Sequence, residues 1–86
     1  MKEEKGAKTL REKLDELVHN VNSIYPNLTK EQKEKADILI EEAINIRSDI
    51  DYDLHTNTIP NLSVYALLYR DLKKRFELLK KEAKLI

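Results

Sequence analysis

Three aspartates alternate with other residues in the segment from Asp49 to His55, which reads Asp-Ile-Asp-Tyr-Asp-Leu-His. Alternate carboxylates are typical of the first half of a calcium-binding loop, where every second side chain binds the ion. Such a loop also needs a glycine at its sixth position and a glutamate at its twelfth, where this chain has Leu54 and Pro60. We therefore predict that no divalent ion binds tightly to the four candidate ligands, Asp49, Asp51, Asp53 and His55.

The same segment is better explained as the acidic end of a helix. Asp49 and Asp53 would share one face of that helix, and Asp51 would point elsewhere. Carboxylates near a helix C-terminus face the negative end of the helix dipole, which is unfavourable. We therefore expect either that the helix unwinds early, between Ile50 and His55, or that a basic side chain lies nearby.

Few groups in the sequence could carry out catalysis. The chain has no cysteine, and a single glycine, Gly6, is too few for a glycine-rich phosphate loop. Its two histidines, His19 and His55, form no recognisable triad pattern with the serines, which leaves open only a triad assembled in the fold. We expect a protein that is not an enzyme and that binds no metal and no cofactor.

The segment from Arg70 to Ile86 is basic, with seven basic residues against three acidic ones. At about 100° per residue, six of the seven fall within an arc of about 120° if the segment is helical. Such an arc suits contacts to phosphates or to an acidic protein surface, although a solvated helix face has the same composition. These six residues, called the basic ridge below, are Arg70, Lys73, Lys74, Lys80, Lys81 and Lys84.

The same helical segment carries more apolar residues than one core-facing stripe requires. The main stripe includes Tyr65, Leu72 and Phe76, and four further apolar residues project away from it. An aligned set of exposed apolar side chains is typical of a protein interface, but a helix covered on both sides by its neighbours also has a broad apolar arc. The candidate protein-binding residues are Val64, Leu67, Leu78 and Leu85.

Sequence signals for helix starts and breaks predict three helices after a flexible tail at residues 1–8. The starts are two capping-box patterns, Thr9-Leu10-Arg11-Glu12 and Thr29-Lys30-Glu31-Gln32. The breaks are Pro26 and the loop from His55 to Pro60. The predicted helices cover residues 9–25, 29–54 and 61–85.

Apolar residues recur every three or four positions in each predicted helix. The stripe of the second helix, from Ala36 to Leu54, covers about 160° and is wide enough to touch two neighbours. We therefore predict an all-α fold, a small antiparallel three-helix bundle dominated by a long hairpin of the second and third helices, with the first helix laid across them. The residues expected to be mutually buried are Leu17, Val21, Leu39, Ile40, Leu72 and Phe76.

The length of 86 residues fits a single helical domain, and 16 basic and 16 acidic residues give a formal net charge of zero. A zero balance argues against a dedicated nucleic-acid coat protein, which is usually basic. No apolar run approaches the roughly 18 residues of a membrane span, and the charged N-terminus does not resemble a signal peptide. We expect a cytoplasmic protein, in which the acidic segment from Ala36 to His55 neutralises part of the basic ridge.

These features favour a non-catalytic helical protein–protein interaction module. We expect an accessory or regulatory subunit that docks on a larger protein or assembly, or associates with itself, through the third helix. The alternative is a nucleic-acid-associated factor, for example one accessory to a DNA-processing machine, that uses the basic ridge. Phosphate contacts weaken steeply with salt and apolar contacts do not, so salt dependence separates the two hypotheses. No membrane and no small-molecule substrate is expected among the partners.

Overall fold

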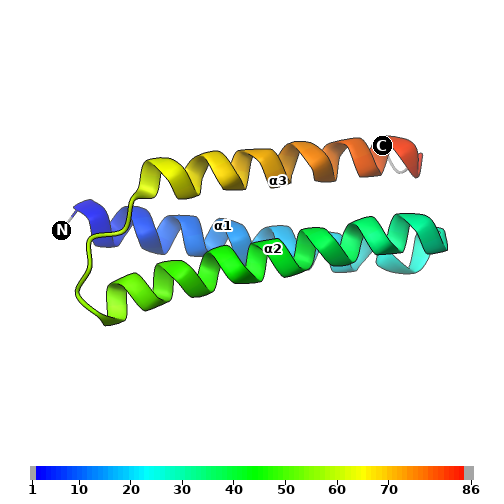
Figure 1. The fold of residues 1–86 in the computed structure, drawn as a ribbon. Coiled ribbons are helices and arrows are strands. Elements are labelled where there is room, and N and C mark those ends of the chain that lie inside the picture. Colours follow the sequence, from blue (N-terminus) through cyan, green and yellow to red (C-terminus); the bar gives the residue numbers. More distant parts are fainter. Residues whose placement is uncertain (1, 85–86) are drawn as a thin grey trace.

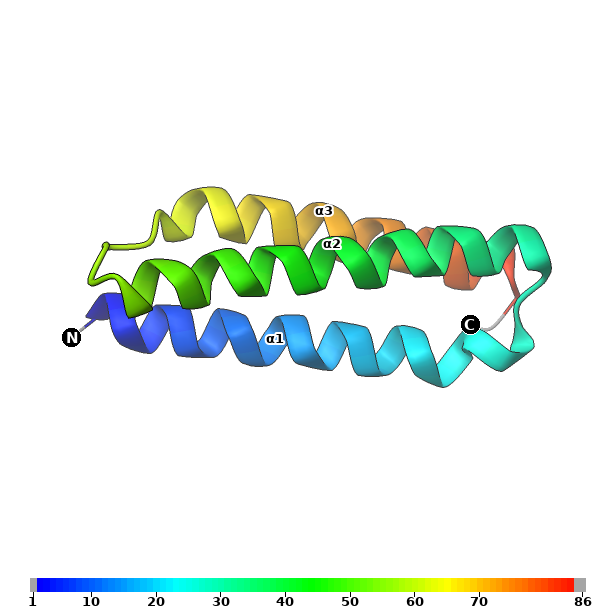
Figure 2. The ribbon, with the colours of Figure 1, turned by 60° about the horizontal axis from the view of Figure 1, so that its bottom comes forward.

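The computed structural model describes residues 2–84 of the chain, with side chains from Gly6 to Lys84. This part holds three long helices, and no strand occurs in it. The helices lie side by side and run in alternating directions, so the bundle is long and narrow (Figures 1 and 2). The predicted all-α three-helix bundle is confirmed. Its elements are α1 (Lys2–Ile24), the short 3-10 turn η1 (Tyr25–Asn27), α2 (Lys30–His55) and α3 (Leu62–Glu82).

The central helix is α2, which contacts both of the others. It packs more extensively against α1 than against α3, and α1 and α3 share the smallest contact. α1 therefore lies along α2 over much of its length, rather than across a hairpin of α2 and α3 (Figure 2). None of the helices among residues 2–84 is both long enough and apolar enough to span a bilayer.

The first helix begins earlier than the sequence predicted. Met1 lies outside the described residues, but residues 2–8 are helical, so the prediction of a tail there is wrong, and Thr9 lies inside α1. Ala7 is completely buried. At Gly6 the helix passes so close to α3 that an added Cβ would lie 2.8 Å from Leu62 Cδ1. Tertiary packing of these small residues thus extends α1 past the local capping pattern.

The second helix begins as predicted and does not unwind early. The Thr29 side chain accepts a hydrogen bond from the Gln32 N–H, and the Gln32 side chain accepts one from the Thr29 N–H, which confirms the capping box. At the other end Asn57 has a φ of 58°, and the Thr58 N–H donates to the Asp53 carbonyl at 2.8 Å. These contacts form a Schellman cap, which satisfies the last carbonyls of α2 and favours a helix that continues to His55.

The third helix is shorter than the predicted range of residues 61–85. Asn61 is its N-cap, with a side chain that accepts from the Val64 N–H at 3.4 Å. α3 ends at Glu82, after which Lys84 adopts a φ of 59° and its N–H donates to the Lys81 carbonyl at 3.1 Å. This turn ends the helix before Leu85, which lies outside the described residues.

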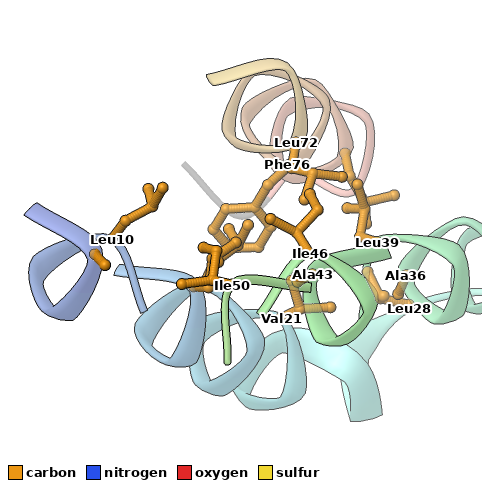
Figure 3. Packing of buried hydrophobic residues seen from close by; sticks show 14 residues of the cluster. Leu10, Val21, Leu28, Ala36, Leu39, Ala43, Ile46, Ile50, Leu72 and Phe76 are labelled. Carbon is orange, nitrogen blue, oxygen red and sulfur yellow. The ribbon is translucent and has the colours of Figure 1, made fainter. Parts of the chain in front are cut away.

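Buried positions in all three helices alternate at spacings of three and four. In α2 they are Ala36, Leu39, Ala43, Ile46 and Ile50, which cover only about 80° of the helix rather than 160°. Strict alternation of three and four is typical of helices whose axes cross at a small angle, whichever way the chains run. The side chains of one helix then insert between those of its neighbour. Figure 3 shows such side chains pointing into the space between the helices. The buried residues of the hydrophobic core are Ala7, Leu10, Leu14, Leu17, Val21, Leu28, Ala36, Leu39, Ala43, Ile46, Ile50, Leu72, Phe76 and Leu79.

Five of the six residues predicted to be mutually buried belong to this core. The exception is Ile40, which is only half-buried because it lies beside the narrow stripe of α2. Ile44 lies still further from the stripe centre and is 49% exposed. The narrow core stripe leaves apolar side chains free on the flanks of the bundle.

Ion pairs between helices follow the antiparallel register. Arg11 and Asp15 of α1 pair with Asp51 and Arg47 of α2 at 2.7 and 2.6 Å. Two further pairs join α2 to α3, and these are Lys35 with Glu82 at 3.0 Å and Glu42 with Arg75. Exposed pairs of this kind contribute about 0–1 kcal/mol each, so they select a register more than they stabilise the fold.

Candidate docking and anion-binding surfaces on α3

One flank of α3 is apolar and exposed. Val64, Leu67 and Leu78, three of the predicted protein-binding residues, are 47%, 62% and 55% exposed. The fourth, Leu85, lies outside the described residues. Leu68 of α3 and Ile38 of α2 are also exposed, at 44% and 50%. These five described residues, Ile38, Val64, Leu67, Leu68 and Leu78, are called the docking face below.

Two of the five were missed by the sequence argument. Leu68 falls within the apolar arc of α3, and a broad arc does not reveal which positions α2 covers. The buried positions Leu72, Phe76 and Leu79 show that the core stripe lies to one side of Leu68. Ile38 directly precedes the buried Leu39 and so projects to the flank of α2 that borders α3. An isoleucine outside the apolar stripe was the one signal available for it.

A groove between α2 and α3 runs along the docking face. One depression in it, of about 270 Å³, is lined by Ile38, Leu39, Leu78 and Leu79 together with charged side chains at its rim. A second, of about 230 Å³, is lined by apolar Ile46, Leu68 and Leu72 and by polar side chains that include Asn45, Asp49 and Asp71. Arg75 borders both, so a charged centre separates the two depressions.

The charged centre consists of three side chains. The Arg75 Nη2 atom pairs with the Glu42 carboxylate of α2, and its Nε atom lies 3.1 Å from Asp71 Oδ2 on the same helix. The Asp71 side chain is 63% exposed, so its carboxylate is open to a further donor. The groove therefore carries both signs of charge at its middle, with an apolar depression on one side and a mixed depression that includes Leu68 on the other.

The basic ridge begins on the flank of α3 that borders α1 and reaches the edge of the docking face at Lys74 and Lys81, which lie four residues before and three residues after Leu78. Lys73 and Lys80 line a groove with Lys13 and Glu16 of α1. Lys80 is half-buried, with its ammonium 4.9 Å from the centre of the Phe76 ring and 3.2 Å from Glu77 Oε1. Its aliphatic chain thus covers part of the core, and its charge is already compensated.

The other five residues of the basic ridge are exposed and form no ion pair within the described part of the chain. The acidic segment of α2 does not neutralise them, contrary to expectation. Glu42 pairs with Arg75, which is not a ridge residue, and Asp51 pairs with Arg11 and lies 3.9 Å from Arg47. The ridge charges are therefore accessible to an external anion. These five residues are Arg70, Lys73, Lys74, Lys81 and Lys84.

The acidic segment from Asp49 to His55 is divided between two sides of α2. Asp51 faces α1 and accepts from Arg11, whereas Asp53 faces α3 and accepts from the Tyr65 hydroxyl at 2.9 Å. Arg11 is the basic neighbour that the helix dipole argument required. Within the described residues no three His, Asp or Glu side chains are grouped so that they could hold a metal ion.

The Tyr65–Asp53 contact changes the acidity of the tyrosine. Burial raises the pKa of Tyr65 above 10.0, and the hydrogen bond to Asp53 and the negative charges of Asp53 and Asp49 raise it further. A folded-state pKa above the unfolded value means that the folded protein holds this proton more tightly. The resulting stability is complete below pH 10 and is lost as the pH rises through the folded pKa.

Replacement of Tyr65 by phenylalanine is expected to lower the free energy of unfolding by about 1 kcal/mol at neutral pH, because it removes one partly exposed hydrogen bond to a carboxylate. It should also reduce the loss of stability above pH 10. Urea unfolding from pH 7 to pH 11 tests both effects. Tyr52→Phe is the matched control, because Tyr52 is 68% exposed and its hydroxyl has no hydrogen bond within the described part. Equal pH profiles for the Tyr65→Phe protein and the unaltered protein would contradict the prediction.

Comparison with models of protein families, with curated proteins and with solved structures found no match. The surfaces of the bundle are thus the basis for a functional proposal.

Proposed function

We propose that the protein is a non-catalytic protein–protein interaction module, an accessory or regulatory subunit that docks on a larger protein or assembly through the docking face. The supporting observation is the alignment of five exposed large apolar side chains along one flank of α3 and the facing edge of α2. A single exposed leucine is ordinary on a protein surface. An aligned set beside a groove is typical of a surface that another chain covers.

The docking face can supply a moderate binding energy. Complete burial of a leucine or isoleucine contributes about 1.5–3 kcal/mol, so burial of the exposed half of one contributes about 1 kcal/mol. The five residues therefore provide roughly 5 kcal/mol before the entropic cost of association is subtracted. Polar contacts at the charged centre add specificity. This balance suits a complex that can dissociate.

The groove between α1 and α2 is less suited to apolar docking. Its borders include Ile44 and Val18, but ion pairs run across it. Arg47 joins Asp15 of α1 to Asp51 of its own helix, and Asp51 also accepts from Arg11. A partner there would have to displace or desolvate these charges, which is costly. The docking face is thus the more favourable surface.

Leu78→Asp is expected to abolish partner binding without unfolding the bundle, because Leu78 is largely outside the core and a buried unpaired carboxylate is costly at an interface. Ile44→Asp is the matched control, since Ile44 is similarly exposed on the other flank of α2. The tagged protein and both variants are incubated with nuclease-treated extract of the native cells, and bound proteins are compared by mass spectrometry. Circular dichroism checks the folding of each variant. A partner that is retained by the Leu78→Asp protein and lost by the Ile44→Asp protein would contradict the proposal.

A second candidate function is binding to nucleic acid through the basic ridge. It is favoured by the five exposed ridge residues that have no ion pair in the described part of the chain. Phosphates could reach these cations without displacing an internal partner. We rank it below protein docking because the aromatic residues of α3 do not interleave with the ridge. Phe76 is buried, and Tyr65 and Tyr69 pack against the core.

A further inference from the structure

The docking face has a self-complementary order of residues along α3. Leu68, Asp71, Arg75 and Leu78 follow one another as apolar, acidic, basic and apolar, and all four border the groove. If a second α3 is laid antiparallel at the same height, centred on residue 73, each residue meets a suitable counterpart. Asp71 faces Arg75 of the second copy, and Leu68 faces Leu78 of the second copy. An interface with two-fold symmetry requires this self-complementarity.

We propose that a second copy of this chain covers the docking face in the free protein, with the two α3 helices antiparallel about a two-fold axis near residue 73. This inference rests on the proposed function, because it identifies the occupant of the same face. A larger partner would then replace one copy, so docking on that partner would compete with dimer formation.

The charged centre has atoms available for such a pairing. The Arg75 Nη2 atom donates to Glu42, its Nε atom lies 3.1 Å from Asp71 Oδ2 without a hydrogen bond, and its Nη1 atom has no hydrogen bond to any described residue. The Asp71 side chain is 63% exposed and pairs only through Oδ2 within that part of the chain. In the dimer Arg75 Nη1 would donate to Asp71 of the second copy, and the reverse pair would form by symmetry. Two ion pairs would then close the centre of the interface.

The apolar ends also match. Leu78 borders the depression of about 270 Å³ with Ile38 and Leu39, and the antiparallel pairing places Leu68 of the second copy against it. The same contact forms at the other end. From Val64 to Leu78 the face extends about 21 Å at 1.5 Å per residue, so it offers about four helical turns of contact. Lys73 and Lys80 lie on the flank of α3 that borders α1 and stay outside the interface, whereas Lys74 and Lys81 lie at its edge beside Leu78.

Paired charge reversals test this geometry. In solution at tens to hundreds of micromolar, the unaltered protein is expected to sediment with twice the chain mass of 10.1 kDa. Asp71→Arg would place two arginines opposite each other in each half of the interface, and Arg75→Asp would place two aspartates there. Each variant alone should dimerise at least about tenfold more weakly, because like charges oppose each other at the centre. A mixture of the two variants restores both ion pairs and should form a heterodimer.

The outcomes separate this inference from the proposed function. Monomeric variants that dimerise only when mixed support the pairing, provided that circular dichroism shows each one folded. Unaltered protein that stays monomeric up to millimolar concentration overturns the second copy as occupant, whereas the proposed function stands if Leu78→Asp still abolishes capture of another protein. A dimer that persists in the Leu78→Asp protein overturns the inference, because the copies then meet through another surface. A mixture that stays monomeric, while the unaltered protein dimerises, overturns the antiparallel register.

Discussion

Replacement of Phe76 by alanine is expected to reduce the free energy of unfolding by about 3–5 kcal/mol. Phe76 is 5% exposed and is the one aromatic residue among the buried side chains. Its ring lies between the helices, as Figure 3 shows. The Lys80 ammonium also lies over the ring, so truncation removes that contact as well. Small domains have only about 5–15 kcal/mol of total stability, so this change alone could leave much of the protein unfolded.

Urea or thermal unfolding followed by circular dichroism measures the Phe76 effect. Leu67→Ala is a suitable control on the same helix, because Leu67 is 62% exposed and its truncation should change stability by less than about 1 kcal/mol. Measurement at low protein concentration keeps self-association from contributing. Equal losses in the two variants would mean that α3 does not present its Phe76 side to the core.

Ile50→Ala is expected to cost about 2–5 kcal/mol, because Ile50 is completely buried and its truncation would leave a cavity between the helices. Its position is informative, since it lies in the last two turns of α2, where the aspartates disfavour a helix. If that end were unwound, the isoleucine would be exposed and its truncation would matter little.

The control for Ile50 is Ile44→Ala in the same helix, at 49% exposure. Urea unfolding of both proteins gives the comparison. A loss for Ile50→Ala of less than about 1 kcal/mol, similar to that of an exposed residue, would contradict the packing of this helix end.

Local signals in the sequence predicted those helix ends that local interactions determine. The Thr29 capping box forms because both of its hydrogen bonds lie within four residues. The proline-containing breaks were also placed correctly, since η1 includes Pro26 and Pro60 precedes α3. The start of α1 could not be predicted in this way. It depends on the burial of Ala7 and on the close approach of Gly6 to Leu62, which is far away in sequence.

The candidate surfaces show the same division. The exposure of Val64, Leu67 and Leu78 follows from their angles on a helix wheel, because α3 is regular. Which acid pairs with which base depends on the register between helices, and the sequence does not determine it. The acidic composition of the segment from Ala36 to His55 suggested that α2 would neutralise the basic ridge. The register between the helices instead places Glu42 beside Arg75, which is not a ridge residue. Side-chain pairing at the docking face thus required the three-dimensional structure.

The most direct test of the docking face is the affinity of one captured partner for two surface variants. Leu78→Asp is expected to weaken binding by about 100-fold or more, because the interface would bury an unpaired charge. The second variant carries Arg70→Glu, Lys73→Glu and Lys84→Glu, all exposed ridge positions that do not lie three or four residues from Leu78. It should bind within about threefold of the unaltered protein, with little dependence on salt. The opposite result would be intact binding by the Leu78→Asp protein, lost binding by the ridge variant, and an affinity of the unaltered protein that falls steeply with salt. That result would contradict the docking face and assign the function to the basic ridge.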